Sequence, residues 1–319
     1  MEFTWERDAE DGVYKQRALS NRLLKAAARE FKITPFTTKV DGFGKRQGES
    51  VTLVHYKPVN VPNSPQLSEH QRVPIDKLEM GGRIIVVQEW GRGLQYTSLA
   101  QDLSKFNPKN AAQAGLIEQM QACMDNGAAA AFKESKIRFT PTSLTGGTID
   151  VNATFSTQAT QNMTHAHMAL LRDYLATDLH TPYFEGENYI GLMTTRLLRG
   201  LKNDRTVELW HQYLRKGDLI FRSELFRVEQ IRCVEITNED ALSNSVGAGS
   251  CLGEGLVFGK DAVSRVEAST PELRADPNYQ GDFGRVKAVM WHGLINFGIT
   301  WDSANDREAR VIYIGSKDN

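Results

Sequence analysis

The stretch that decides the fold is residues 107–135, NPKNAAQAGLIEQMQACMDNGAAAAFKES, which carries the longest helical pattern in the chain. Asn107 can accept hydrogen bonds from the first free backbone amides, and Pro108 suits the first helical position because its missing N–H is not needed there. Most of the residues that follow favour helix. The sequence therefore predicts one helix of roughly 40 Å, which is long for one compact domain, so other elements should pack along it.

One face of this predicted helix is apolar. Leu116, Met120, Cys123 and Met124 recur at steps of three and four residues and so form one stripe. Gly127 lies inside the same helix, where glycine costs about 1 kcal/mol relative to alanine. We therefore expect Gly127 to be the weak point of the helix.

The composition is that of an ordinary soluble globular chain, with 319 residues of which 40% are hydrophobic. The net charge of −1 provides no global field that would draw the chain to nucleic acid or to a membrane surface. The three cysteines are widely spaced and odd in number, which indicates a reducing compartment. The acidic start lacks the apolar core of a secretory signal, and no run approaches the roughly 18 apolar residues of a transmembrane helix. We expect a protein that is made and used in solution.

A long extended hairpin is predicted ahead of the long helix. Residues 49–59 and 83–90 are strand-like, with both faces partly apolar, and the proline-containing loop at 60–82 lacks helical periodicity. An isolated two-stranded ribbon is marginal in water, and its exposed edges invite pairing with another chain. We therefore expect the ribbon to lie on a neighbouring subunit, although a hairpin folded back on its own core is an open alternative. The expected contacts are the apolar residues of the polar loop, namely Leu67, Val73, Ile75 and Leu78.

The rest of the chain mixes helical and strand-like segments. Further helices are expected at residues 14–31, 99–106, 164–180, 194–201 and 207–214. Strands are expected at residues 136–143, 148–155, 189–193 and 223–236, and a strand with a short helix at 256–266. Residues 286–301 and 307–314 are expected to form the last strand pair, with a turn at 302–306.

Two patterns that could carry chemistry have simpler structural explanations. Gly249-Ser250-Cys251-Leu252-Gly253 has the form of a nucleophile elbow, but no strand is expected before it and no helix after it. His165 and His167 lie two residues apart on a predicted helix, so their side chains point about 200° apart and cannot share one metal ion.

A basic run follows one face of a predicted helix, at Arg196, Arg199, Lys202 and Arg205. Such a face could touch phosphate, but a solvated or subunit-facing surface is the more ordinary explanation. The carboxylates are scattered, and neither a Walker pattern nor a dinucleotide-binding glycine motif is present. We therefore predict no catalytic, cofactor-binding or metal-binding residue and a protein that is not an enzyme.

Several stretches in a fixed order carry a family resemblance. GESVTLVHYKPV at 48–59 is similar to the upstroke of an extended loop, and QEWG with LQYTS at 88–98 to its downstroke. In the loop tip, Leu67-Ser68-Glu69 is followed by His70, where the family often has glycine. FGKDAV at 258–263, VMWH at 289–292 and FGI at 297–299 are similar to a C-terminal block. In this order they resemble the major capsid proteins of tailed bacteriophages, with the α+β fold first seen in phage Hong Kong 97, and the short-tailed phage subgroup in particular.

The resemblance implies a domain organisation. It comprises an N-terminal arm at 1–44, an extended β-hairpin loop at 45–98, a peripheral domain with a long spine helix at 99–155 and 284–319, and an inserted axial domain at 156–283. It also implies pentamers and hexamers that close an icosahedral shell around double-stranded DNA, which they enclose without sequence-specific binding. Scaffold, portal and decoration proteins are the further partners that such a shell can have. The expected location is the virion, preceded by the host cytoplasm, with no cofactor and no membrane contact.

Two other functions stay open from the sequence. A different virion structural or assembly protein, such as a tail component, would share the strand-rich character but would not need the arm, ribbon and long helix in this order. A cytoplasmic hydrolase would use Cys251 as its nucleophile.

Overall fold

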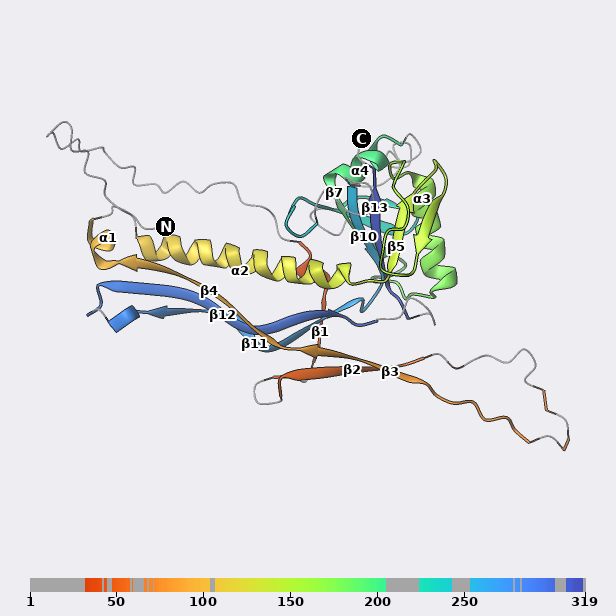
Figure 1. The fold of residues 1–319 in the computed structure, drawn as a ribbon, viewed down its shortest axis with the longest axis horizontal. Helices are drawn as coiled ribbons and strands as arrows, with labels where there is room; N and C mark the ends of the chain where they lie inside the picture. The colour runs from red at the N-terminus through yellow and green to blue at the C-terminus, as the bar shows by residue number, and fades with distance from the viewer. Residues whose placement is uncertain are drawn as a thin grey trace.

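A computed structural model describes residues 32–41, 43–44, 48–57, 59, 66–67, 69–70, 72–103, 107–204, 224–242, 253–277, 279–281, 283–301 and 308–317. These residues form an elongated molecule with a four-stranded sheet, a seven-stranded sheet and a separate two-stranded ribbon (Figure 1). The helices expected at 14–31 and 207–214 and the turn at 302–306 lie outside the described residues.

The long helix is confirmed as α2, Pro108–Lys133. The side chain of Asn107 accepts a hydrogen bond from the backbone amide of Lys109 at 3.0 Å, as expected for a cap. Leu116 is wholly buried against β12, beside the half-buried Met120 and Cys123, so the predicted stripe faces the core. A short helix, α1 at Ser98–Leu103, precedes α2.

The four-stranded sheet lies along α2 (Figure 1). Its order is β1 (Thr38–Lys39), β11 (Val263–Asp276), β12 (Val286–Ile299) and β4 (Gln88–Thr97). The pairs β11–β12 and β12–β4 are antiparallel, whereas β1 joins β11 in parallel. Val289, Trp291, Ile295, Phe297 and Ile299 are buried, which confirms the predicted shared face of β12.

Gly127, inside α2, is required by packing. A Cβ added to Gly127 would lie 2.3 Å from Cη2 of the Trp90 indole and 3.1 Å from the ring of Phe297. The two rings pack on each other with centroids 6.0 Å apart. The expected weak point of the helix is therefore a place where α2 lies too close to β4 and β12 for a larger side chain.

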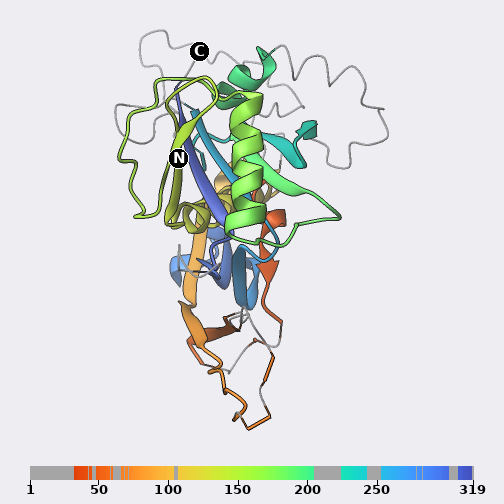
Figure 2. The same ribbon diagram turned by 90° about the vertical axis from the view of Figure 1, so that its right-hand side faces the viewer.

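The seven-stranded sheet forms the second unit. Its order is β6 (Gly147–Asp150), β5 (Ile137–Pro141), β13 (Val311–Ser316), β10 (Gly253–Phe258), β7 (Tyr189–Thr194), β9 (Ile231–Ile236) and β8 (Glu224–Val228). Helix α3, His165–Asp173, continues as a π-helical turn at Tyr174–Asp178 and lies across this sheet, as Figure 2 shows. Helix α4, Thr195–Lys202, begins directly after β7 and is capped by Thr194. The expected helices at 164–180 and 194–201 are thus confirmed.

The two sheets share one core around the last turns of α2. Phe132 of α2 packs on Phe258 of β10 with ring centroids 4.6 Å apart, and Phe297 of β12 belongs to the same cluster. A partly buried ion pair joins α2 to β10, because Lys133 Nζ lies 2.9 Å from a carboxylate oxygen of Glu254. The Glu254 side chain is wholly buried and also accepts a hydrogen bond from the hydroxyl of Tyr313. The C-terminal end of α2 is therefore fixed between the sheets.

Three sequence expectations are wrong in detail. Segments 286–301 and 307–314 do not pair, because β12 lies in the four-stranded sheet whereas β13 pairs with β10 and β5. The strand expected at 83–90 is divided at Val87, where the chain passes from the ribbon into the four-stranded sheet. Segment 256–266 contains two strands, β10 and β11, in place of a strand and a short helix.

No helix among the described residues has both the length and the apolar character needed to cross a membrane.

Two glycine substitutions in α2 test the close approach. We expect Gly127→Ala to destabilise the fold by about 1–3 kcal/mol, because the new methyl group must displace Trp90. Gly115→Ala is the matched control, since its Cβ meets nothing within 4 Å, and we expect it to stabilise the helix by up to about 1 kcal/mol. Urea unfolding measures both free energies, and equal effects of the two substitutions would contradict the packing described.

Candidate assembly interface

The two-stranded ribbon consists of β2, Ser50–Tyr56, and β3, Met80–Val86. The strands are antiparallel, with Leu53 opposite Arg83. The ribbon lies on the side of the four-stranded sheet away from α2, and the described part of its loop extends beyond the body (Figure 1). The predicted extended hairpin is therefore confirmed in its strands and its pairing.

Burial alternates strictly along the ribbon. Val51, Leu53 and His55 are half-buried and face the body, whereas their neighbours in sequence are exposed. Because successive side chains of a strand point to opposite faces, the exposed residues form one outer face. That face is apolar and includes Tyr56, which is 70% exposed. Its other large apolar members are Val54, Met80, Ile84 and Val86, all exposed.

The sequence analysis expected the ribbon to lie on a neighbouring subunit but named residues only in the loop tip, and it did not single out this outer face. The signal was present, because both faces of the strand pair carry apolar side chains while only one can pack on the body. A monomer seldom exposes a large contiguous apolar patch unless the patch binds something.

The four tip residues named from the sequence are exposed as well. Ile75 is 93% exposed, and Leu67, Val73 and Leu78 are each about half-exposed or more. The tip and the outer face together give the ribbon nine large apolar side chains that its own subunit does not cover. Contact of the tip with a neighbouring subunit stays a prediction.

The base of the ribbon is held by packing on β12. Ile85 is buried, and a Cβ added to Gly298 would lie 2.9 Å from its side chain, so glycine provides the space. Phe297 faces α2, so Gly298, the next residue, faces the opposite side of the sheet. The Asn296 side chain donates a hydrogen bond to the backbone carbonyl of Val86 at 2.7 Å.

Polar contacts fix the base further. Nε2 of His55 lies 3.5 Å from Oε1 of Glu308, and the imidazole packs on the indole of Trp301 with centroids 4.7 Å apart. Nη2 of Arg83 lies 3.1 Å from a carboxylate oxygen of Glu134, at the end of α2. The ribbon therefore leaves the body in one defined direction, with its apolar outer face toward solvent.

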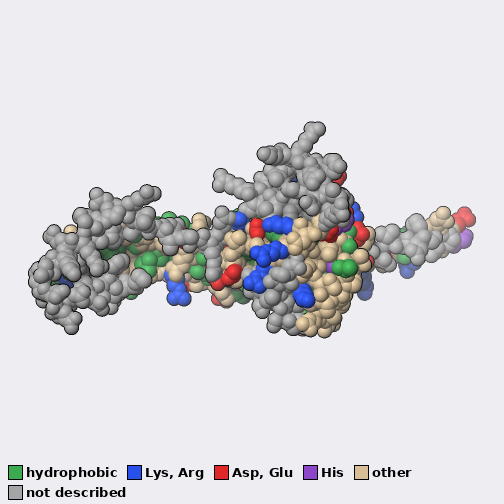
Figure 3. Space-filling view, turned by 90° about the horizontal axis from the view of Figure 1, so that it is seen from above, with side chains coloured by type: hydrophobic (Ala, Val, Ile, Leu, Met, Phe, Trp, Pro, Cys, Tyr) green, Lys and Arg blue, Asp and Glu red, His purple; other side chains and the backbone are tan. Residues whose placement is uncertain are grey.

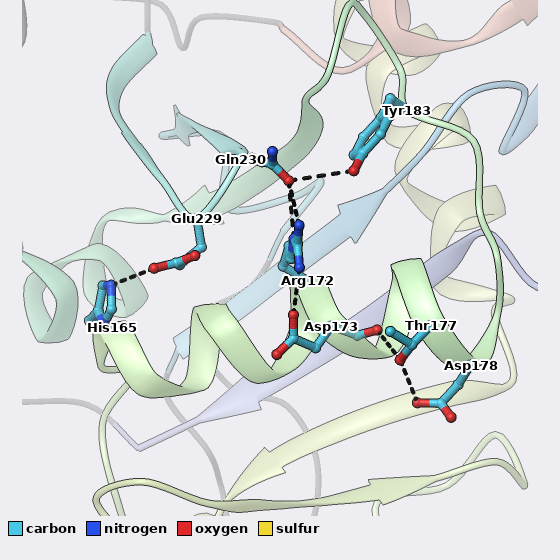
Figure 4. A network of polar contacts seen from close by, with 8 residues as sticks. All are labelled: His165, Arg172, Asp173, Thr177, Asp178, Tyr183, Glu229 and Gln230. Carbon is cyan, nitrogen blue, oxygen red and sulfur yellow. Dashed lines mark hydrogen bonds and ion pairs between the residues drawn. The ribbon is translucent and has the colours of Figure 1, made fainter.

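The two histidines considered as metal ligands have different partners. Nε2 of His165 lies 3.0 Å from Glu229, as Figure 4 shows. His167 is buried, with Nδ1 3.1 Å from the backbone amide of Thr164 and Nε2 2.8 Å from the backbone carbonyl of Ser143. Among the described residues, no group of three or more histidine, cysteine or acidic side chains is placed to hold a metal ion.

A second group of polar contacts in Figure 4 attaches α3 to the β8–β9 turn. Arg172 donates from Nε and Nη2 to the side-chain oxygen of Gln230 at 3.1 and 3.0 Å, and the Tyr183 hydroxyl reaches the same oxygen at 3.4 Å. Glu229 and Gln230 both have positive φ, at 47° and 60°, as a tight hairpin turn requires. These side chains secure the helix on the sheet and do not form a catalytic arrangement.

The other candidates from the sequence lie partly outside the described residues. Cys251 and Arg205 lie outside the described side chains. Cys123 is half-buried, and burial raises the pKa of its thiol, which makes it a poorer nucleophile. Helix α4 exposes Arg196, Arg199 and Lys202 on one face. It lies at the top of the body, and the view from above shows Lys and Arg side chains gathered on that side (Figure 3).

No family model matches the chain, and no curated protein matches its sequence. Solved structures match it from end to end. The capsid of Ralstonia phage GP4 superposes with a TM-score of 0.69 at 13% identity, covering 99% of both chains. The cyanophage Pam1 capsid gives 0.68 at 15% identity, covering 100% of both chains. The chain has the Hong Kong 97-type capsid fold.

A third example confirms the predicted α+β fold class. The capsid structure of Helicobacter pylori bacteriophage KHP30 gives a TM-score of 0.64 at 13% identity, covering 93% of both chains. In these terms α2 is the spine helix of the fold, and the β2–β3 ribbon is its extended loop. Identities this low show a shared fold and leave the function to be argued from the surfaces of this chain.

A substitution at the ribbon base tests how the ribbon is held. We expect Gly298→Val to displace Ile85 and loosen the base, so that chymotrypsin cleaves after Tyr56 about tenfold faster. Gly82→Val is the control, because Gly82 is exposed and its Cβ would be in ordinary contact, 3.5 Å from Thr52. Equal cleavage rates in the two variants would contradict a base held by Ile85.

The dependence of stability on pH tests the burial of His167. Burial lowers the pKa of His167, against the hydrogen bonds to Ser143 and Gly146 that raise it. In the unfolded chain the His167 imidazole binds a proton below about pH 6.5, whereas in the folded chain its lowered pKa opposes protonation. The free energy of unfolding therefore falls as the pH falls through that value.

We expect the urea midpoint to fall between about pH 7 and pH 5, and His167→Gln to weaken that dependence. His165→Gln, at a more exposed position, is the matched control and should retain it. An unchanged pH dependence in His167→Gln would show that other groups cause the effect.

Proposed function

We propose that this chain is a major capsid protein that self-assembles into pentamers and hexamers and forms the icosahedral shell around phage double-stranded DNA. The observation that carries the proposal is the ribbon, whose outer face and tip expose nine large apolar side chains on a chain with a capsid fold. A subunit of this shape is incomplete alone, because no described part of its own body covers the outer face and the tip of the ribbon.

The energetics favour assembly. Fully burying one large apolar side chain contributes about 1.5–3 kcal/mol relative to leaving it exposed. Partial burial of the ribbon by a neighbour would therefore offset much of the entropy lost on association. Closed symmetry repeats the same contact at every subunit, so modest contacts add up over a shell.

The predicted domain division is part of this proposal. The arm at 1–44, the extended loop at 45–98, the peripheral domain at 99–155 and 284–319 and the axial domain at 156–283 remain the proposed units. The seven-stranded sheet contains strands from both proposed domains. Strands β5, β6 and β13 come from the peripheral ranges, and β7, β9 and β10 come from the axial range. The two proposed domains would therefore share that sheet.

The proposed role is structural and needs no catalytic centre. A tail component and a hydrolase using Cys251 are both less favoured, because the fold is matched from end to end by capsid structures. The proposed location is the virion, after a period in the host cytoplasm. Scaffold, portal and decoration proteins are proposed further partners, and the DNA would be enclosed without sequence-specific contacts.

A charge in the ribbon tip tests the proposal. We expect Ile75→Asp to reduce the yield of particles by about tenfold or more, because a carboxylate would be buried at each copy of the contact. The folded subunit should be unaffected, since Ile75 is 93% exposed. Asp76→Asn is the neighbouring control and should assemble normally.

The readout is the fraction of the chain in the large peak of a sizing column, imaged by negative-stain electron microscopy. The chain is expressed alone and with the genes that neighbour it. Normal particles from Ile75→Asp would show that the ribbon tip is not part of the contact between subunits. Only monomers from the unaltered chain in every preparation would contradict the capsid function.

A further inference from the structure

Residues 32–40 cross the junction between the two sheets, and we call this segment the strap. It contains a 3-10 turn, Thr34–Phe36, followed by β1 at the edge of the four-stranded sheet. Its contacts reach α2, the seven-stranded sheet and β11, three parts of the chain far apart in sequence.

The first contact is a buried carboxylate in the middle of α2. Asp125 is 1% exposed, and its two oxygens accept five hydrogen bonds from the strap. The donors are the backbone amides of Lys32, Ile33 and Thr34, at 2.7 to 3.1 Å, and the Thr34 hydroxyl, at 2.7 Å. A buried carboxylate is strongly destabilising unless it is hydrogen-bonded, so the charge of Asp125 is tolerated only with the strap in place.

The second contact is aromatic. Phe36 is buried against Phe258 of β10 and Phe184, with ring centroids 6.1 and 5.9 Å away. Ile33, at the start of the strap, is wholly buried in the same cluster as Phe132 of α2. These side chains join the strap to the core that the two sheets share.

The third contact is with β11. Thr38 and Lys39 pair in parallel with Ser264 and Arg265, and the amide of Val40 donates to the carbonyl of Arg265 at 2.9 Å. Nζ of Lys39 lies 2.8 Å from the carboxylate of Glu267. The strap thus contacts the seven-stranded sheet through Phe36 and the four-stranded sheet through β1.

We propose that the strap is a clasp that fixes the angle between the two sheets, and that Asp125 is the positioning residue that closes it. Opening the strap breaks β1–β11 but no pairing between the longer strands, because β1 is a two-residue edge strand. A segment of this kind can open locally without global unfolding. Five hydrogen bonds gathered on one carboxylate make the closing depend mainly on a single side chain.

The consequence for assembly rests on the proposed function. The ribbon base is attached to β12, whereas α3 and α4 lie on the seven-stranded sheet. Surfaces on the two sheets can meet neighbours at a constant angle only while the sheets keep one orientation. An open strap would therefore leave a folded subunit that forms particles of mixed curvature.

Hydrogen exchange of the unassembled chain, read by mass spectrometry, tests the clasp directly. In Asp125→Asn we expect the amides of residues 33, 34 and 36–40 to exchange about tenfold faster or more, because hydrogen bonds to a charged acceptor are lost. The amides of α2 and β12 should keep their protection. Asp150→Asn is the matched control, a half-buried carboxylate that accepts from the amide and hydroxyl of Ser156 at 2.9 and 2.6 Å.

Thr34→Val provides a milder variant if Asp125→Asn does not fold, because it removes one of the five hydrogen bonds and keeps the backbone donors. We expect Thr34→Val to speed amide exchange in the strap by a smaller factor, with the protection of α2 and β12 unchanged. Unchanged exchange in the strap would overturn the proposal. Equal loss of protection in the strap and α2 would also overturn it, since Asp125 would then stabilise the core in general.

The effect on assembly is measured separately, as the spread of particle diameters in electron micrographs. We expect a broad distribution from Asp125→Asn and a narrow one from the unaltered chain and from Asp150→Asn. Narrow distributions from all three would overturn the link between the strap and curvature. Absence of particles from the unaltered chain would count against the capsid function and leave the exchange result as the test of the clasp.

Discussion

The packing of α2 against both sheets is the constraint on which the rest of the structure depends. At Gly127 the helix approaches β4 and β12 so closely that Trp90 and Phe297 occupy the space of a side chain. At its last turns Phe132 and Lys133 contact β10 through an aromatic pair and a partly buried ion pair. One helix thus supplies core residues to two sheets, and the cluster around Phe132 and Phe258 joins them in one elongated body (Figure 1).

This arrangement decides what is left for assembly. Because α2 covers one face of the four-stranded sheet, the ribbon base packs on the other, where Gly298 receives Ile85. The strict alternation along β2 and β3 then turns half of the ribbon side chains toward the body and half toward solvent. The outward half is apolar, so the interactions that complete the subunit also produce a surface that only another molecule can cover.

Local patterns predicted much of this fold. The Asn107 cap, the Leu116 stripe and the alternation around Trp291 are properties of neighbouring residues, and each was confirmed. Non-local pairing was harder to predict, because nothing near residues 302–306 indicates that the strands on either side enter different sheets. The role of Gly127 depends on Trp90, and the burial of Asp125 depends on amides more than 90 residues away in sequence. The tip of the candidate interface was visible as apolar residues in a polar loop, whereas the outer face of the ribbon required knowing which face the body covers.

The most direct test of the central claim is a cryo-electron microscopy reconstruction of the particles that the chain forms. The account predicts a closed icosahedral shell in which the ribbon of each copy lies on another copy, with Ile75 and the outer face covered. A shell in which each ribbon packs on its own subunit, or a chain that stays monomeric with its partners present, would contradict it.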